Sequence, residues 1–143
     1  MDKRFDFAGK YTVITGAAGN IGQSIISSLI DTHSNLILLD RDIKLMENML
    51  NEKKVDMSTI HLINYDATDK NSCMNVTKDI KKITNKIDYV VNSIGMVGTD
   101  TDSGWTVQFE DQSMESWNKC IDINLTSVFF LIQKLLPFLK ESQ

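Results

Sequence analysis

The sequence predicts an α/β fold in which helices cover a parallel β-sheet, and three observations support this prediction. Short apolar runs rich in β-branched residues alternate along the 143-residue chain with amphipathic segments of helix length. The connections between them are short. One run, residues 36–40, is apolar until its final acid, as expected of a strand buried on both faces. Such βαβ units have right-handed crossovers, and we expect a doubly wound sheet with the strand order 3-2-1-4.

Composition limits the classes of protein that the chain can represent. With 42% hydrophobic and 24% charged residues, residues 1–143 fit one globular domain. The net charge of −4 argues against nucleic-acid and anionic-membrane partners. The first ten residues are polar and no uninterrupted apolar run has the length of a membrane span, so we expect a cytoplasmic chain. Cys73 and Cys120 match no metal-ligand spacing, and we expect neither a disulfide nor a metal site.

A glycine-rich turn at residues 15–22 organises the other predictions. It follows the strand expected at residues 11–14 and opens a segment whose apolar residues recur at helical spacing. Gly16, Gly19 and Gly22 are expected to provide positive φ angles, close approach of a ligand and packing room. The backbone N–H groups at the helix N-terminus attract a phosphate. Glycines also serve ordinary turns, but the strands on both sides favour a dinucleotide-binding turn.

Two charged residues follow the second strand and bear on the choice of cofactor. Asp40 lies 24 positions after Gly16, near the roughly 20 positions expected of the acid that bonds the adenosine ribose. The alternative is an N-cap of the next helix, a role that Asp42 could serve instead. The carboxylate of Asp40 repels the 2′-phosphate of NADP, whereas Arg41 attracts it, and we favour NAD.

The next βα unit places an acid at the carboxyl end of the third strand. We expect a structural helix over residues 43–53 and the third strand over residues 59–64. Asp66 follows that strand, where a carboxylate can accept hydrogen bonds from the amino group of adenine. The alternative for this turn is capping of the next helix by Thr68 or Asp69, and both roles can coexist.

The fourth strand is expected over residues 87–95. It is apolar until it meets Asn92 and Ser93, and Gly95 then lets the backbone approach a ligand. Residues 96–112 form a longer loop, whose aromatic residues Trp105 and Phe109 suggest a partly ordered flap on the substrate side.

A long helix is expected beyond the flap. Residues 113–116 resemble a capping box, and the apolar pattern then continues to Lys140 with a possible break near Asp122. Around residues 128–132 the segment is apolar on more than one face, so it should be buried against the sheet and a second surface. We expect a homo-oligomer, or association through the helix over residues 121–139.

In chain order, these features resemble the short-chain dehydrogenase/reductase family over residues 10–140. The glycine turn and Asp40 are similar to the family's phosphate-binding turn and its NAD-selecting acid. Asp66 and Ala67 are similar to the pair that holds adenine. Residues 92–95 resemble its Asn-Asn-Ala-Gly segment, although the two middle residues depart from that pattern.

Asn124 resembles the family's asparagine that kinks a helix and supports a proton-relay water. The resemblance implies a Rossmann-type fold, a bound NAD with NADP less favoured, and hydride transfer between nicotinamide and an alcohol, ketone or sugar. The residues expected to bind the dinucleotide are Gly16, Ala18, Gly19, Asn20, Ile21, Gly22, Asp40, Arg41, Asp66, Ala67, Asn92, Ser93 and Gly95.

The catalytic residues of the family have no counterpart here. Family members carry a serine on a later strand and Tyr-x-x-x-Lys on a later helix, and none of Tyr11, Tyr65 and Tyr89 has a lysine four positions on. Without an acid–base group near the substrate carbonyl, the charge that develops on the carbonyl oxygen during hydride transfer is not neutralised. We therefore expect the cofactor-binding half of an oxidoreductase, truncated before the later strands and inactive alone, with an unknown small-molecule substrate.

Three alternatives remain open. The first alternative is a fragment of an extended, nucleotide-sugar-modifying member of the family, because these members prefer the spacing in which Gly19 is followed by Asn20. The second alternative is a stand-alone NAD-binding module that contacts a protein partner. The third is a decayed remnant that folds poorly. An in-frame continuation beyond Gln143 that carries Ser and Tyr-x-x-x-Lys would favour the enzyme over the last two.

Overall fold

The computed structural model describes residues 6–96 and 107–141 and confirms the predicted sheet. Four parallel strands pair in the order β3-β2-β1-β4. The strands are β1 (Tyr11–Thr15), β2 (Asn35–Asp40), β3 (Ile60–Asn64) and β4 (Tyr89–Asn92). The α-helices are α1 (Asn20–Leu29), α2 (Ile43–Glu52), α3 (Lys70–Ile83), α4 (Met114–Ile121) and α5 (Ser127–Lys140). The same described residues also form three short 3-10 helices, η2 (Ile30–Thr32), η3 (Met57–Thr59) and η4 (Phe109–Asp111).

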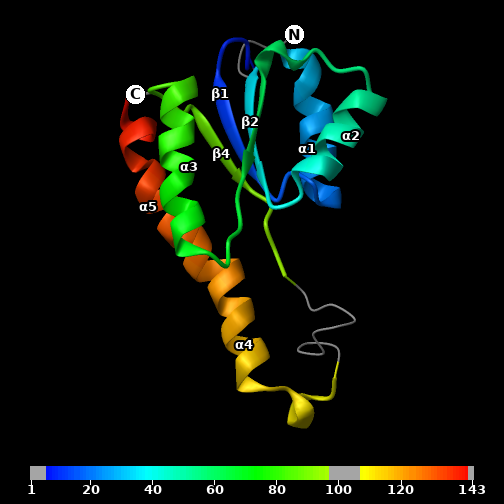
Figure 1. Ribbon diagram of the computed structural model, residues 1–143, viewed down its shortest axis with the longest axis vertical. Coiled ribbons are helices and arrows are strands. Elements are labelled where there is room, and N and C mark those ends of the chain that lie inside the picture. Colours follow the sequence, from blue (N-terminus) through cyan, green and yellow to red (C-terminus); the bar gives the residue numbers. More distant parts are fainter. Residues whose placement is uncertain (1–5, 97–106, 142–143) are drawn as a thin grey trace.

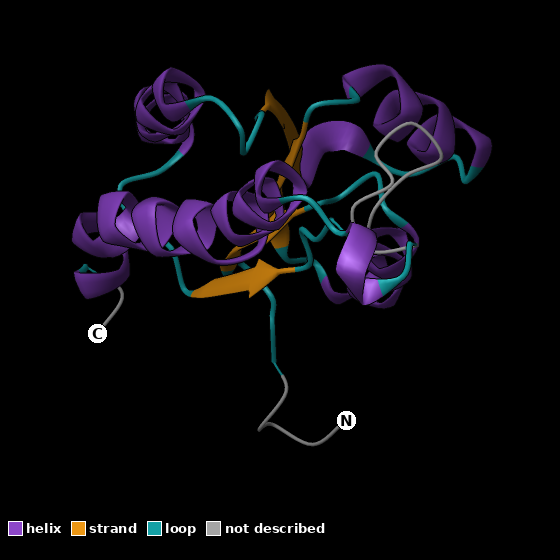
Figure 2. Ribbon diagram, turned by 90° about the horizontal axis from the view of Figure 1, so that it is seen from below, coloured by secondary structure: helices purple, strands orange, loops and turns teal. Residues whose placement is uncertain are grey.

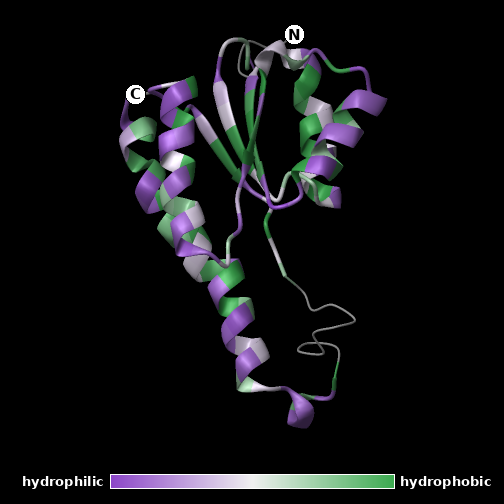
Figure 3. Cartoon of the chain, viewed as in Figure 1, coloured by the Kyte–Doolittle hydropathy of each residue, from purple (hydrophilic) through white to green (hydrophobic). Residues whose placement is uncertain are grey.

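Helices cover both faces of the sheet. α1 and α2 lie on one face, and α3 and α5 lie on the other (Figures 1 and 2). Because successive strand residues point to opposite faces, Ile14 and Leu38 enter the core beneath α1 and α2, whereas Val13 and Leu39 enter the core beneath α3 and α5. Figure 3 shows the resulting apolar colouring of the strands between the helix layers. The apolar runs of the sequence are therefore strands buried on both faces.

Side chains cap three of the α-helices in the described part of the chain. Asp42 caps α2, Asp69 caps α3 and Ser113 caps α4, each by accepting a hydrogen bond from a backbone N–H of the first helical turn. The N-cap of α1 is Gly19, and among the described residues no side chain caps this helix. The first N–H groups of α1 are therefore left for water or a ligand.

The helix after the flap is irregular at Asp122, where the sequence indicated a possible break, but it continues past this point. A π-helical turn, η5 (Asp122–Thr126), joins α4 to α5 and absorbs the irregularity without ending the helix. The resulting helix, Met114–Lys140, is long and apolar enough to cross a membrane by length and composition, which the sequence analysis did not expect. Its buried residues Leu131 and Leu135 pack against the sheet, as in the core helix of an α/β domain.

β4 is shorter than the predicted strand, because the chain leaves the sheet after Asn92. Its amino end is held by Asp88, whose carboxylate accepts a hydrogen bond from the N–H of Tyr11 at 2.8 Å and pairs with Lys10 Nζ at 3.3 Å. Beyond its carboxyl end, the N–H of Ser93 donates to the carbonyl oxygen of Thr15 at 3.3 Å. Both ends of β4 are thus attached to β1.

Candidate functional site

The carboxyl ends of the four strands meet at one edge of the sheet. The N–H of Tyr65, just after β3, donates to the carbonyl oxygen of Asp40 at the end of β2 (2.9 Å). Ser93, just after β4, donates to Thr15 at the end of β1. In doubly wound sheets ligands bind at this edge, where the strand order reverses, and here the reversal lies between β1 and β4. The fold therefore brings the predicted residues of four separate segments together.

The three glycines of the turn have different structural roles. Gly16 has a φ of +63°, and a Cβ atom there would lie 2.8 Å from both the carbonyl oxygen of Ser93 and the N atom of Ile94. A Cβ atom at Gly22 would collide with the carbonyl oxygen of Gly16. Gly19 has a φ of −73°, and a Cβ atom there would lie 3.2 Å from that same oxygen. Gly16 thus has the positive φ expected in the turn and Gly22 has the expected packing role, while the segment after β4 packs closely against Gly16.

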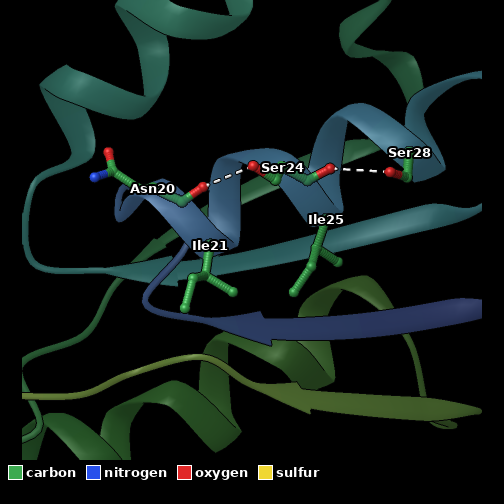
Figure 4. Close-up of a pocket in the computed structure, with 5 residues that line it drawn as sticks. All are labelled: Asn20, Ile21, Ser24, Ile25 and Ser28. Carbon is green, nitrogen blue, oxygen red and sulfur yellow. Dashed lines mark hydrogen bonds between the residues drawn. The ribbon is translucent and has the colours of Figure 1, made fainter.

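The first helical turn of α1 lies next to the glycine turn and is open to solvent. Asn20 and Ile21 are exposed, and Ile21 keeps 67% of its surface accessible. A shallow pocket of about 390 Å³ lies along this side of α1. Figure 4 shows the residues that line it, which are Asn20, Ile21, Ser24, Ile25 and Ser28. The hydroxyls of Ser24 and Ser28 donate to backbone carbonyls one helical turn earlier, so they stay within the helix. The structure thus places Asn20 and Ile21 at an accessible helix end.

Asp40 lies at the predicted position and also holds the glycine turn. Its Oδ2 accepts a hydrogen bond from the N–H of Ala18 at 2.9 Å, and its Oδ1 accepts one from the N–H of Asp42 at 3.0 Å. Because Asp42 caps α2, the capping alternative applies to Asp42. Each carboxylate oxygen has a second lone pair, so Asp40 can accept ribose hydroxyls while it holds Ala18. The bond to Ala18 was missed, because no local pattern encodes a contact between segments 22 residues apart.

Asp66 is a charged hydrogen-bond acceptor at the end of β3. The Oδ1 atom of Asp66 accepts hydrogen bonds from the hydroxyl of Thr68 at 2.7 Å and from the N–H of Thr68 at 2.9 Å. These two bonds lower the pKa of the Asp66 carboxyl, the bond from the hydroxyl more than the other, and the charge of Arg41 lowers it further. Asp69 caps α3, so in this turn Asp66 and Asp69 have separate roles. Ala67 beside them is half-buried. The arrangement suits recognition of a hydrogen-bond donor such as an exocyclic amino group.

Residues 92–95 are fixed by side-chain bonds. Ser93 Oγ donates to the carbonyl oxygen of Thr15 at 2.5 Å, and Thr15 Oγ1 lies 3.5 Å from Asn92 Oδ1. The serine that departs from the family pattern thus ties the end of β4 to β1. A Cβ atom at Gly95 would lie 3.9 Å from Asn124 Oδ1, an ordinary contact.

Asn124 lies in the π-helical turn and holds the backbone that follows Gly95. Its Oδ1 accepts a hydrogen bond from the N–H of Met96 at 2.7 Å, and its Nδ2 donates to the carbonyl oxygen of Met96 at 2.9 Å. This two-point contact orients the segment after β4 at the edge where the other predicted residues meet. The resemblance implied a helix-kinking asparagine, and the structure adds the clamp on Met96.

A second cavity, which the sequence analysis missed, lies between the start of α3 and the helix formed by α4, η5 and α5. Its volume is about 840 Å³, and its walls come from segments far apart in the chain. Tyr65 lines it and is only 2% exposed. Burial raises the pKa of Tyr65 to about 12, against a smaller opposing effect of a hydrogen bond with Ser127. Burial also raises the pKa of the Cys73 thiol.

Alkaline pH should destabilise the fold through Tyr65. The unfolded chain loses this proton near pH 10.0 and the folded chain near pH 12, so the contribution to stability is complete below the lower value and is lost as the pH rises toward the upper one. Urea denaturation should show the free energy of unfolding falling between these values, with a shallower fall in Tyr65→Phe. Tyr89→Phe is the control, and equal slopes in the two variants would show that Tyr65 is not the cause.

Part of the predicted flap lies outside the described residues, including Trp105. Phe109, in η4, is 87% exposed. The described residues form a Rossmann-type α/β domain with a glycine turn between β1 and α1, an uncapped N-terminus of α1, and carboxylates at the carboxyl ends of β2 and β3. This donor set fits the phosphates, ribose hydroxyls and base of a dinucleotide.

Comparison with known proteins agrees with this class. The family model for short chain dehydrogenase matches residues 10–143. The chain belongs to the short-chain dehydrogenase family. It is 31% identical over 93% of its length to an NAD-dependent glycerol dehydrogenase of Listeria innocua, of which it covers 48%. It is 25% identical over 99% of its length to a rhamnolipids biosynthesis 3-oxoacyl-[acyl-carrier-protein] reductase of Pseudomonas aeruginosa, of which it covers 52%.

Solved structures show the same fold. The Pseudomonas aeruginosa RhlG/NADP active-site complex matches with a TM-score of 0.84 and 24% identity, over 99% of this chain and 52% of that one. A short-chain dehydrogenase/reductase from Brucella melitensis matches with a TM-score of 0.79 and 28% identity, over 94% and 54%. The chain thus spans about half the length of the relatives that it matches.

Proposed function

We propose that this chain forms the dinucleotide-binding half of an NAD(P)-dependent oxidoreductase that transfers a hydride between nicotinamide and an alcohol, a ketone or a sugar. The observation that carries the proposal is the hydrogen bond from Ala18 to Asp40. It places the acid of β2 directly on the glycine turn, so that groups suited to a pyrophosphate and to a ribose lie side by side. The nicotinamide, when bound, supplies the carbon that gives or takes the hydride.

The residues of this chain bind and orient the dinucleotide. The open N-terminus of α1 offers N–H groups to the pyrophosphate. Asp40 accepts the ribose hydroxyls, and Asp66 with Ala67 borders the adenine. At the other end of the site, Asn124 holds the backbone of Met96 in place. No residue in this set is assigned the transfer of a proton to the substrate.

We propose NAD as the preferred cofactor. The Asp40 carboxylate repels a 2′-phosphate, and the charge of Arg41 acts in part on the carboxylate of Asp66. That neighbour weakens the attraction of Arg41 for an added phosphate. The name of the Listeria innocua relative states NAD dependence, whereas one solved neighbour is an NADP complex. A direct comparison of the two cofactors is therefore the relevant test.

The 143-residue chain alone should produce no NADH. It contains no Tyr-x-x-x-Lys around any of its tyrosines, so nothing supplies the acid–base step that hydride transfer needs. The assay measures absorbance of NADH with NAD and a panel of alcohols that includes glycerol. Formation of NADH by the chain, abolished in Asn124→Ala, would place a complete active site within these residues and contradict the proposal.

A non-catalytic dinucleotide-binding module is the second candidate. The observation that favours it is the same absence of Tyr-x-x-x-Lys, combined with a fully formed glycine turn. Both candidates require dinucleotide binding. The two candidate functions are distinguished by adding a second half that carries Ser and Tyr-x-x-x-Lys, because only the half of an oxidoreductase then gains activity.

A further inference from the structure

The cavity between the start of α3 and the helix formed by α4, η5 and α5, here called the α3 cavity, lies apart from the predicted dinucleotide site. Its walls come from residues 65–73 and from residues 115–130. Figure 1 shows the start of α3 beside the junction of α4 and α5, at the far end of α5 from Lys140. Of the residues expected to bind the dinucleotide, all of which the structure describes, only Ala67 lines the α3 cavity. The cavity is therefore a separate feature of the fold.

Buried side chains bring polar atoms to the wall of the α3 cavity. Tyr65, Cys73 and Ser127 keep only 2%, 3% and 8% of their surface exposed. The Ser127 hydroxyl donates to the carbonyl oxygen of Ile123 at 2.6 Å and also bonds with Tyr65. A hydroxyl oxygen has two acceptor sites, so the oxygens of Tyr65 and Ser127 each keep one for a further donor. The wall thus offers hydrogen-bond acceptors to a group inside the cavity.

Much of the remaining wall is apolar and aromatic. Phe130 and Ile123 are half-buried, and Phe129 is 67% exposed. With the ring of Tyr65, two phenylalanine rings surround the same space, and aromatic rings favour offset or edge-to-face contact with another ring. The volume of about 840 Å³ lies within the range of roughly 300–1,000 Å³ that small-molecule sites have. An apolar wall with a few converging polar groups is the usual composition of such a site.

Charge argues against an ionised ligand in the α3 cavity. The burial that raises the pKa of Tyr65 to about 12 and also raises the pKa of Cys73 keeps both groups neutral near pH 7. Among the described residues that line the cavity, three carboxylates and two ammonium groups are exposed to solvent, so neither sign dominates. They are Asp69, Lys70, Glu115, Lys119 and Asp122. An ion would lose its hydration without gaining a buried partner of opposite charge.

We propose that the α3 cavity binds an uncharged aromatic molecule that carries a hydroxyl group. The ring of the ligand packs among the rings of Tyr65, Phe129 and Phe130, and its hydroxyl donates a hydrogen bond to the oxygen of Tyr65. This site goes beyond the proposed dinucleotide binding and does not depend on it. A linear aliphatic chain is the competing occupant.

Titration calorimetry of the 143-residue chain with naphthol tests the proposal. Naphthol combines two fused aromatic rings with one hydroxyl, and we expect saturable binding at one site. Naphthoate has the same rings with a carboxylate, and it should bind at least tenfold more weakly. Decanol has the hydroxyl without a ring, and it should bind at least fivefold more weakly. No saturable binding up to the solubility of naphthol, or equal or tighter binding of naphthoate or decanol, would overturn the proposal.

Two matched variants locate the ring of the ligand. Phe129 lines the α3 cavity, whereas Phe109 in η4 lies outside its wall, and both side chains are largely exposed. Because exposed side chains contribute little to stability, both alanine variants should fold. Phe129→Ala should weaken naphthol binding at least fivefold, and Phe109→Ala should leave it unchanged. Equal effects of the two substitutions would contradict this location.

A second pair of variants tests the hydrogen bond. Tyr65→Phe keeps the ring and removes the hydroxyl, so the affinity for naphthol should fall at least threefold. Tyr89→Phe, in β4 and outside the cavity wall, should have no effect. Circular dichroism confirms that each variant is folded before the titration. Unchanged affinity in folded Tyr65→Phe would exclude Tyr65 as the acceptor and overturn the proposed site.

Competition with NAD separates this site from the dinucleotide site. Naphthol should bind equally well in the presence of NAD, because the two sites share only Ala67. Displacement of naphthol by NAD would place the ring at the carboxyl edge of the sheet and overturn the proposal. Binding of naphthol by a chain that binds neither NAD nor NADP would contradict the proposed function and leave the α3 cavity standing as a site.

Discussion

Replacing Asp40 by alanine should lower the affinity for NAD and narrow the preference for NAD over NADP by ~1–3 kcal/mol, the scale of a hydrogen bond to a charged group. Two effects combine in this variant. The ribose hydroxyls lose their acceptor, and the N–H of Ala18 loses the bond that positions the glycine turn. Titration calorimetry with each cofactor measures both affinities. Removal of the Asp40 carboxylate also removes its repulsion of the 2′-phosphate of NADP. Because a misplaced turn weakens the binding of both cofactors, we expect the affinity for NADP to rise by less than this loss of repulsion alone would produce.

Asp42→Ala is the matched control for this prediction. It removes a carboxylate two residues away that caps α2 and accepts from the N–H of Leu45. This variant should cost about 1 kcal/mol of stability, the usual value of an N-cap, and should leave the ratio of the two affinities unchanged. Equal binding of NAD and NADP by the unmodified chain would show that Asp40 does not select the cofactor.

Gly16→Val should destabilise the whole domain by about 3 kcal/mol or more, from strain and overpacking. A valine at a φ of +63° is strained, and its Cβ atom would meet the backbone of Ser93 and Ile94 at 2.8 Å. The substitution therefore disturbs the contact between the turn and the segment after β4, and we also expect it to weaken dinucleotide binding. Urea denaturation followed by circular dichroism measures the loss of stability.

Gly19→Ala isolates the phosphate contact from the fold. Gly19 has an ordinary φ, and a Cβ atom there lies 3.2 Å from one carbonyl oxygen, so stability should change by less than about 1 kcal/mol. The added methyl group lies at the uncapped start of α1, where it should weaken NAD binding. A Gly16→Val variant as stable as the unmodified chain would contradict the close packing of Gly16 against the segment after β4. Full NAD affinity in Gly19→Ala would mean that the turn does not contact the pyrophosphate.

The strand order and the layers of the fold could be predicted because they depend on local patterns. Apolar runs such as residues 36–39 identify strands, the helical spacing of Ile26 and its neighbours identifies the covering helices, and the handedness of the crossovers decides the order. The position of Asp40 at the strand end followed from the same patterns. These features require no knowledge of contacts between distant residues.

The details of the site depend on contacts that local patterns do not contain. The bond between Ala18 and Asp40 and the clamp of Asn124 on Met96 each join segments more than twenty residues apart. Gly16 has the positive φ expected of the turn, but its close packing against the segment after β4 is another contact between distant residues. The possible break near Asp122 takes the form of a π-helical turn that starts at this residue and keeps the helix continuous.

The central claim is that the carboxyl edge of the sheet binds a dinucleotide, and an NMR titration of the 143-residue chain with NAD tests it most directly. We expect saturable shifts of the amide signals of Ala18, Gly19, Asp66 and Ser93. Amides at the opposite end of the sheet, such as that of Tyr11 beside Asp88, should not shift. An absence of shifts at millimolar NAD, or shifts confined to the Asp88 end, would contradict the claim.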